Sequence, residues 1–510
     1  MTSGVNADAT TGHRKTVRTV DLNRILAWFN VIILAATVVS FGQSGGNQYM
    51  DGTTVALAVI LCLQTQVALL IERRRRDPFI VVVAFILILY YSLRLLTLLL
   101  LASSVVLDRF PYSPIDSNAA LLFIILANVF LYAGLYIAGG KRQLTVDVGG
   151  WRPTAPLRTM AFVVFAMALI YSRGVLWNPN DSPRIVQVFF AFASQSVLFL
   201  MALAYYLVFR RRMSWVVGST FLALLVIEMV VHTLAGSRSA FVYALQNALI
   251  VLLAVGGSVA LPRRAVLASA VALPFVMALL VASFIVSTTV GAYRASGVPI
   301  TPTMAIEAST AAVARLDRQY AMEAGLPLIF SRAGFFDYSA EVIAHRRQYQ
   351  AVINLAAYVK SIIDNLLTPG FDVFDQPKIS NALKFVYDDK GTPSKIASAE
   401  EYQSDQLGVY GELFVLFGYA GLPLFFVGSF LMKRVYFALR AANPFTLAMK
   451  RVVTLAIFVQ VINSFGFDWT IAEVVPFVAG IYIFRAFFPA TPAPAAQSVS
   501  FARTAGLSPG

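Results

Sequence analysis

The run DPFIVVVAFILILYYSLRLLTLLL, residues 77–100, holds a single charged side chain beyond its first residue, Arg94. It follows the arginines at positions 73–76, and it is long enough to cross a hydrocarbon core of about 30 Å as one helix. A spanning segment must pair its backbone polar groups away from water, which a single long run does as a helix. The stretch therefore predicts a transmembrane α-helix with basic residues before its start.

The same pattern recurs along the whole chain. The chain is 58% hydrophobic and 13% charged, with a mean hydropathy of +0.72, which does not suit a soluble globule of this length. Apolar runs of about 17 to 25 residues can be placed at about twelve positions. They start near Ile25, Thr53, Phe79, Ala119, Arg158, Val186, Trp215, Ser239, Ala265, Leu407, Arg451 and Glu473. We therefore expect an all-α integral membrane protein with about twelve transmembrane helices.

The distribution of basic residues predicts the orientation. If the amino terminus is cytoplasmic, more than half of the 40 Lys and Arg residues fall in segments on the same side as that terminus, and the short segments on the other side carry few. Both termini are then cytoplasmic, and one large polar loop lies outside. The predicted parts are a cytoplasmic tail (1–24), a first transmembrane bundle (25–287), the large extracytoplasmic loop with helical pieces (288–406), three further spans (407–488) and a disordered cytoplasmic tail (489–510).

The net charge of +14 follows from this topology and does not indicate nucleic-acid binding. The basic runs are expected to act as anchors at the lipid headgroups. Cys62 is the only cysteine, so no disulfide within the chain can brace the outer loop. We expect the loop to be held by packing on the bundle.

Ionisable residues in apolar surroundings are the first candidates for chemistry, because a charge in lipid is rarely kept without a task. Arg94 lies about 16 residues beyond the cytoplasmic start of its span, and hence near the outer leaflet. Either it contributes to a site there, or it extends to the outer headgroups.

A second candidate lies at the expected outer turn Gly236-Ser237-Arg238-Ser239. A helix amino terminus together with a guanidinium suits a phosphate or diphosphate, because both present N–H donors to the oxygens. Glu228 and His232 precede this turn and share a helix face, being four residues apart. The alternative is a tight external turn whose arginine pairs with a loop carboxylate.

The outer loop supplies the third candidate. The segment Ser331-Arg332-Ala333-Gly334-Phe335-Phe336-Asp337-Tyr338 brings together a cation, aromatic rings, a carboxylate and a phenol, and His345 follows in an expected helical run. Aromatic faces beside carboxylates are suited to sugars. The alternative is a loop element that packs on the membrane surface.

The fourth candidate is the point where the chain re-enters the membrane after the loop. Asp405 precedes this point, and Glu412 lies one or two turns inside the expected span, where it must face protein or water. Gly408, Gly411 and Gly418 permit close helix approach or a break in the helix.

At these residues the chain resembles the Wzy-type O-antigen or exopolysaccharide repeat-unit polymerases, which form a wider group with the O-antigen ligases. The likeness is carried by Asp77-Pro78-Phe79 after a basic run, by Gly236-Ser237-Arg238-Ser239, by the single large outer loop and by Gly411-Glu412-Leu413-Phe414 to Phe417-Gly418. It covers most of the bundle, through short and degenerate motifs.

The resemblance implies a GT-C-like bundle with no metal and no other cofactor. It implies transfer of an undecaprenyl-diphosphate-linked oligosaccharide to another lipid-linked repeat at the outer face of the cytoplasmic (inner) membrane. The partners would be that lipid-linked substrate, membrane lipid and a chain-length regulator protein, with no nucleic acid. Within this scheme arginines stabilise the departing diphosphate, and a carboxylate or histidine takes the acceptor proton.

The expected diphosphate ligands are Arg238, which matches the family pattern, and Arg332, Arg294 and Arg94, which are chosen by position and charge. The expected catalytic residues are His345 or Asp337, followed by Asp405 and Glu412.

Three other functions remain open at this point. A ligase relative would transfer finished polymer to another acceptor. A flippase or other transporter would need ionisable residues near the membrane midplane, whereas the candidates here cluster at the outer face. A structural scaffold would leave Arg94, Glu228 and Glu412 unexplained.

Overall fold

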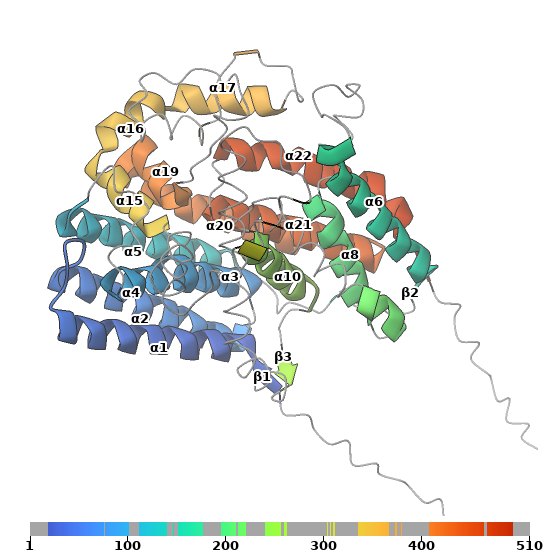
Figure 1. The fold of residues 1–510 in the computed structure, drawn as a ribbon, viewed down its shortest axis with the longest axis horizontal. Coiled ribbons are helices and arrows are strands. Elements are labelled where there is room, and N and C mark those ends of the chain that lie inside the picture. The colour runs from blue at the N-terminus through green and yellow to red at the C-terminus, as the bar shows by residue number, and fades with distance from the viewer. Residues whose placement is uncertain are drawn as a thin grey trace, which may run out of the picture.

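The protein is described by a computed structural model, and its described part is mostly helical (Figure 1). The structure describes residues 19–75, 77–100, 112–139, 146, 151–176, 195–210, 213–220, 240–256, 260–262, 303, 307, 310–311, 335–366, 373–374, 379, 407–463 and 467–492.

Residues 78–100 form the most buried of the long apolar helical rods that the structure describes. This rod begins with α3 (Pro78–Leu87), passes through a π-helical turn, η1 (Ile88–Ser92), and ends with α4 (Leu93–Leu100). Asp77 caps the start of α3 by accepting a hydrogen bond from the Phe79 backbone N–H, and Pro78 suits the first helical turn. Over this rod 83% of the apolar window is buried inside the protein, so it occupies the centre.

Three further long helices surround the rod, and two of them have clear end signals. Gly45, with φ +69°, ends α1 in the left-handed conformation, and the Ser113–Asp116 capping box begins α5. The α1 helix lies beside α2 and α4, and α2 also packs against α5. The bounds are α1 Leu22–Ser44, α2 Gly52–Arg75 and α5 Pro114–Ile137.

The carboxyl-terminal part of the bundle contains a broken helix. It consists of α19 (Gly408–Phe417), the short 3₁₀ helix η6 (Gly418–Gly421) and α20 (Leu422–Ala438). The α20 helix crosses α5 closely at Gly134. A side chain at this position would collide with the Ser429 Oγ atom, so glycine permits the close approach. The next helix, α21 (Pro444–Asn463), packs on α8, α10, α19, α20 and α22.

Six of the expected spans are confirmed as helices long and apolar enough to cross a membrane, among the residues that the structure describes. They are Leu22–Ser44, Gly52–Glu72, Pro78–Leu100, Pro114–Ile137, Gly408–Ala438 and Pro444–Asn463. The chain is thus a mostly helical protein with the features of a multi-pass membrane protein. Four more expected spans coincide with helices whose described apolar stretches are shorter: α6 Pro156–Leu176, α8 Gln195–Phe209, α10 Ala240–Gly256 and α22 Phe467–Phe484. The expected spans from Ala265, and from Trp215 beyond residue 220, lie outside the described residues.

Two small antiparallel ribbons, which the sequence analysis did not predict, add strands to the helical bundle. Strand β1 pairs with β3, and β2 pairs with β4. The strands are β1 Thr19–Asp21, β2 Trp151–Pro153, β3 Ala260–Pro262 and β4 Ala490–Pro492. All four strands lie in segments that the basic residues place on the cytoplasmic side. Regular structure also continues past Phe488, where the tail was expected to begin.

Helices of the polar segment 288–406 lie at the opposite end of the bundle from the β1–β3 ribbon (Figure 1). They are α15 (Phe335–Ala344), α16 (Arg346–Val352) and α17 (Leu355–Leu366), joined by a one-residue turn at His345 and by the two residues 353–354. Elsewhere in the bundle, the short 3₁₀ helix η7 (Arg485–Phe487) extends α22. The α15 helix packs on α5 and α19, and α17 lies beside α22. Packing on the bundle therefore positions these three helices, as the lack of a second cysteine required.

Candidate functional site

A buried ion pair fixes α15 to the central rod. The Arg94 guanidinium donates from Nε to Asp337 Oδ1 at 3.0 Å and from Nη2 to Asp337 Oδ2 at 2.6 Å. Both side chains have no exposed surface. A planar guanidinium that meets both oxygens of a carboxylate forms the strongest and most directional kind of protein ion pair. The structure therefore brings together two predicted site residues from segments far apart in the sequence.

The π-helical turn η1 ends two residues before Arg94. An extra residue in one helical turn rotates the residues that follow it, and such turns are frequent at functional sites. In η1 the Tyr90 ring packs edge-on against Phe335 of α15, and Tyr91 packs edge-on against Tyr410 of α19. These contacts join the rod to both helices at the level of the ion pair.

Tyr112, just before α5, borders the ion pair. Burial raises the pKa of Tyr112 well above its ordinary value, the Asp337 carboxylate raises it further, and the Arg94 guanidinium opposes this rise. Its ring lies 5.1 Å from that of Tyr49, measured between centroids. The surroundings of the pair are therefore dry and aromatic, and the phenol stays protonated at neutral pH.

A second carboxylate of α15 was missed by the sequence analysis. Glu341 is fully buried and accepts a hydrogen bond of 2.5 Å from the Tyr349 hydroxyl of α16. It follows Asp337 by four residues, so both carboxylates lie on one face of α15. That spacing could have revealed Glu341, but the sequence analysis placed Asp337 in the loop segment 331–338 and not in the helical run that follows it.

His345 lies between α15 and α16 and is partly exposed. Its Nδ1 atom is 3.3 Å from the backbone carbonyl oxygen of Glu341. A carbonyl oxygen can only accept, so this contact favours the tautomer with the proton on Nδ1. In that tautomer Nε2 carries the lone pair and is the nitrogen that can take up a proton.

Arg346 clamps the end of α19. Its Nε atom donates to the Val415 carbonyl at 3.3 Å, and its guanidinium lies over the Phe414 ring at 5.4 Å from the centroid. Gln350 donates to the same Val415 carbonyl at 2.8 Å. A cation at a helix carboxyl terminus interacts favourably with the unpaired carbonyls and the helix dipole. Glycine suits position 418, because the backbone there has φ +59° and an added Cβ would lie 3.2 Å from the guanidinium.

Glu412 lies in α19, one turn before the carbonyl that Arg346 contacts, and only 2% of its surface is exposed. The sequence required Glu412 to face protein or water, and in the structure it is buried in protein. Thus α15, α16 and α19, which carry Asp337, Glu341, Arg346 and Glu412, pack on one another at one end of the bundle, and His345 lies at the junction of α15 and α16.

The other predicted site residues lie outside the described residues. They are Arg238, Arg294, Arg332 and Asp405, together with Glu228 and His232. Within the described ranges no three His, Cys, Asp or Glu side chains are grouped so that they could hold a metal ion.

A second buried cluster lies at the end of the bundle that carries the β1–β3 ribbon. It is separate from the residues of α15, α16 and α19. Lys433 of α20 pairs with Asp77 and donates to the Leu135 carbonyl of α5 at 2.6 Å. Burial raises the pKa of Asp77, and the charge of Lys433 opposes this rise. The Asp77 backbone N–H also donates to Glu72. Asp77, one of the residues of the family likeness, therefore joins α3 to α5 and α20.

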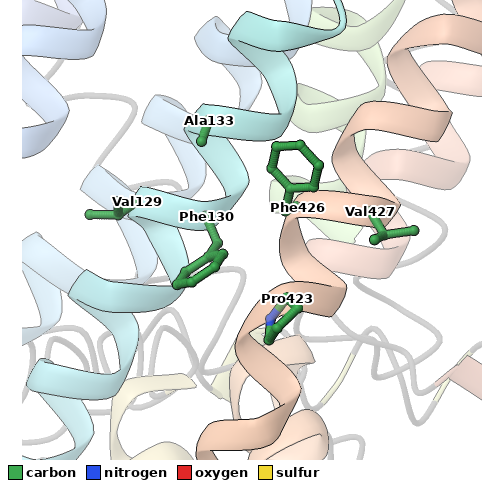
Figure 2. Close-up of a pocket in the computed structure, with 6 residues that line it drawn as sticks. All are labelled: Val129, Phe130, Ala133, Pro423, Phe426 and Val427. Carbon is green, nitrogen blue, oxygen red and sulfur yellow. The ribbon is translucent and has the colours of Figure 1, made fainter.

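An apolar groove of about 260 Å³ opens between α5 and α20 (Figure 2). Its lining contains no polar side chain: Val129, Phe130, Ala133, Pro423, Phe426 and Val427. The groove lies between the η6 break, beside Arg346, and the close crossing of Gly134 with Ser429. Its dimensions and chemistry suit a hydrocarbon chain.

Comparisons with protein-family models, with curated proteins and with solved structures find no match to this chain.

Proposed function

We propose that this protein polymerises undecaprenyl-diphosphate-linked oligosaccharide repeat units into a surface polysaccharide, which would be an O-antigen, a capsule or an exopolysaccharide. The transfer would be metal-independent and would occur at the outer face of the cytoplasmic membrane. One observation carries the proposal: the carboxylates of α15 and α19, the His345 imidazole and the Arg346 guanidinium belong to segments that pack together at one end of an apolar bundle. A sugar linked to a membrane lipid would present its reacting atoms at this end of the bundle, beside the lipid headgroups.

The reaction would be a displacement at the anomeric carbon of the donor. The bond from this carbon to the diphosphate oxygen breaks, a bond to the acceptor hydroxyl oxygen forms, and the hydroxyl proton passes to a base of the protein. The electron pair of the broken bond leaves with the lipid diphosphate, which cationic groups stabilise.

We assign the base to His345. Its contact with the Glu341 carbonyl favours a basic Nε2, and its side chain is partly exposed at the junction of two helices. Both oxygens of Asp337 accept hydrogen bonds from Arg94. Asp337 is therefore better suited to holding α15 in place than to accepting a proton. Glu412 would orient the reacting groups from within α19. The diphosphate would then be bound by Arg238, Arg294 and Arg332.

The groove between α5 and α20 supports a lipid-linked substrate. Its apolar lining offers a place for the isoprenoid chain, and it begins next to the helix break that Arg346 contacts. A substrate that lies there would present its diphosphate toward the charged helices.

The test is the length distribution of lipid-linked glycan in cells that lack the protein or carry wild type, His345→Gln or Arg238→Ala. The matched control is Arg347→Gln, which changes an exposed side chain two positions from His345. We expect single repeats to accumulate on the lipid in the deletion and in both site variants, and normal chains in the control. Membrane abundance is checked by immunoblot.

The same measurement separates the other functions. Long polymer that stays on the carrier would identify a ligase. Repeats that accumulate on the cytoplasmic side would identify a flippase. An unaltered glycan in the deletion strain would contradict the proposal.

A further inference from the structure

Helix α17 is amphipathic, and it belongs to a segment that the sequence predicts to be a polar loop. Its buried face consists of Ala357, Tyr358, Ser361 and Asp364. The opposite face presents large apolar side chains, with Leu355 60% exposed and Val359 48% exposed. These two residues are four apart, so they form one stripe along the helix.

A second pair of exposed apolar side chains is held beside the end of α17. The Asp364 Oδ1 atom accepts hydrogen bonds from the backbone N–H groups of Val373 at 2.9 Å and of Phe374 at 3.0 Å. The carboxylate at the end of α17 thus fixes these two residues next to the helix. Both side chains are exposed, Val373 by 61% and Phe374 by 45%. Leu355, Val359, Val373 and Phe374 are called the α17 patch below.

A single cation borders the α17 patch in the described part of this segment. The Lys360 ammonium group lies 5.9 Å from the centroid of the Phe374 ring, and the Lys360 side chain is exposed. A long basic side chain beside an aromatic ring is the arrangement that anchors a helix at a membrane interface, with its apolar part in lipid and its charge at the headgroups.

The position of α17 in the fold indicates what covers the patch. The helix lies alongside α22, an apolar helix of the bundle (Figure 1). The α22 helix exposes apolar side chains of its own, such as Val478 and Ile483. The α17 helix therefore packs on a bundle helix that has an exposed apolar surface of its own, which favours lipid as the cover of the α17 patch. If these four large apolar side chains were exposed to water, the protein would lose about 25 cal/mol of hydrophobic free energy for each Å² of apolar surface that a cover would bury.

We infer that the α17 patch contacts the lipid bilayer, in the leaflet on the side of α15 and α16, with acyl chains against the apolar stripe and Lys360 at the headgroups. This inference does not rest on the proposed function, because it uses only the packing of α17 and the exposure of its apolar side chains.

The test uses a fluorescent label on an introduced cysteine. Cys62 is buried in α2 and is the only cysteine of the chain, so Cys62→Ala supplies the background. Val359→Cys is labelled with a nitrobenzoxadiazole dye, and the full-length protein is placed in phosphatidylcholine vesicles. The matched control is Gln348→Cys, at an exposed polar position of α16.

We expect the label at position 359 to show blue-shifted emission, loss of fluorescence with doxyl-labelled lipid and no loss with aqueous iodide. The label at position 348 should show the reverse. Iodide quenching at position 359 equal to that at position 348 would overturn the inference. Protection from both quenchers would also overturn it, since the patch would then be covered by protein. Elution of both variants as wild type in size-exclusion chromatography verifies that they are folded.

Discussion

The Arg94–Asp337 pair joins residues 243 positions apart and has no access to solvent. Two charges in such surroundings lose their hydration, and their mutual attraction roughly offsets that loss when the geometry is good. The pair therefore specifies where α15 sits more than it adds to stability. Its contacts with both oxygens explain why a lysine at position 94 would be a poor substitute.

Removing one partner of the pair should be far more harmful than removing both. Arg94→Ala or Asp337→Ala alone leaves a buried charge and should lower the free energy of unfolding by about 3–5 kcal/mol. The free energy of unfolding of the double variant should fall by much less than the sum of the decreases in the two single variants, because no buried charge remains. Thermal unfolding of the four proteins in detergent measures this coupling, and additive losses would refute the pairing.

Gly418 is the residue on which the Arg346 clamp depends. Its φ of +59° with ψ of −140° is accessible almost only to glycine, and an added Cβ would crowd the guanidinium. Gly418→Ala should therefore destabilise the protein by about 1–3 kcal/mol. Gly428→Ala is the control, since no atom lies within 4 Å of the added Cβ and the site is helical. That variant should be neutral or stabilised by about 0.5–1 kcal/mol. Equal effects of the two substitutions in thermal unfolding would contradict this account.

At the scale of the element, helix ends are set by local side chains. Asp51 precedes α2, and its Oδ1 accepts from the backbone N–H of Thr54 at 2.8 Å and from the Thr54 hydroxyl at 2.9 Å. The hydrogen bond from the Thr54 backbone is the main cause that lowers the pKa of Asp51. The charged carboxylate is thus the form that the folded protein prefers.

The pKa of Asp51 is lower in the folded than in the unfolded protein. The contribution of Asp51 to the free energy of unfolding is therefore fully present above its unfolded-state pKa, and it is lost as the pH falls through its folded-state pKa. At neutral pH, Asp51→Ala should lower stability by about 0.5–2 kcal/mol, as loss of a helix cap does. The difference between variant and wild type should shrink in acid, below about pH 4. Unfolding midpoints measured at pH 7 and pH 3.5 check this, and a difference that grows in acid would contradict the assigned cap.

The sequence predicted the long spans well, because about twenty consecutive apolar residues leave the helix as the only way to pair the backbone in lipid. It did not predict the π turn at Ile88–Ser92, since nothing in the composition of that segment differs from its neighbours. The break between α19 and α20 was suggested by Gly418 and by the glycine and proline that follow. The partnership of Arg94 with Asp337 could not be predicted, because no local pattern links residues so distant in the chain.

For the whole molecule, the structure separates two ends. The ribbons β1–β3 and β2–β4 join segments predicted to be cytoplasmic, while α15 and α16 lie at the opposite end (Figure 1). The count of Lys and Arg along the sequence predicts that the ribbon segments are cytoplasmic and that α15 and α16 lie outside. Small ribbons escaped prediction because three-residue strands have too few positions to show alternation.

We predict that the two ends face different compartments. In the Cys62→Ala background, Gln348→Cys in α16 should react with a membrane-impermeant maleimide in intact spheroplasts. Ala442→Cys, in the exposed turn between α20 and α21, should react only after permeabilisation. Labelling of both from the same side would contradict the predicted topology.

The most direct test of the proposed polymerase is chain growth by the purified protein in vesicles that contain a lipid-linked repeat unit. We predict a ladder of longer lipid-linked glycans that forms in the presence of a metal chelator and is reduced to single repeats by His345→Gln. No ladder with folded wild-type protein and its own substrate, or an unchanged ladder with His345→Gln, would contradict the account.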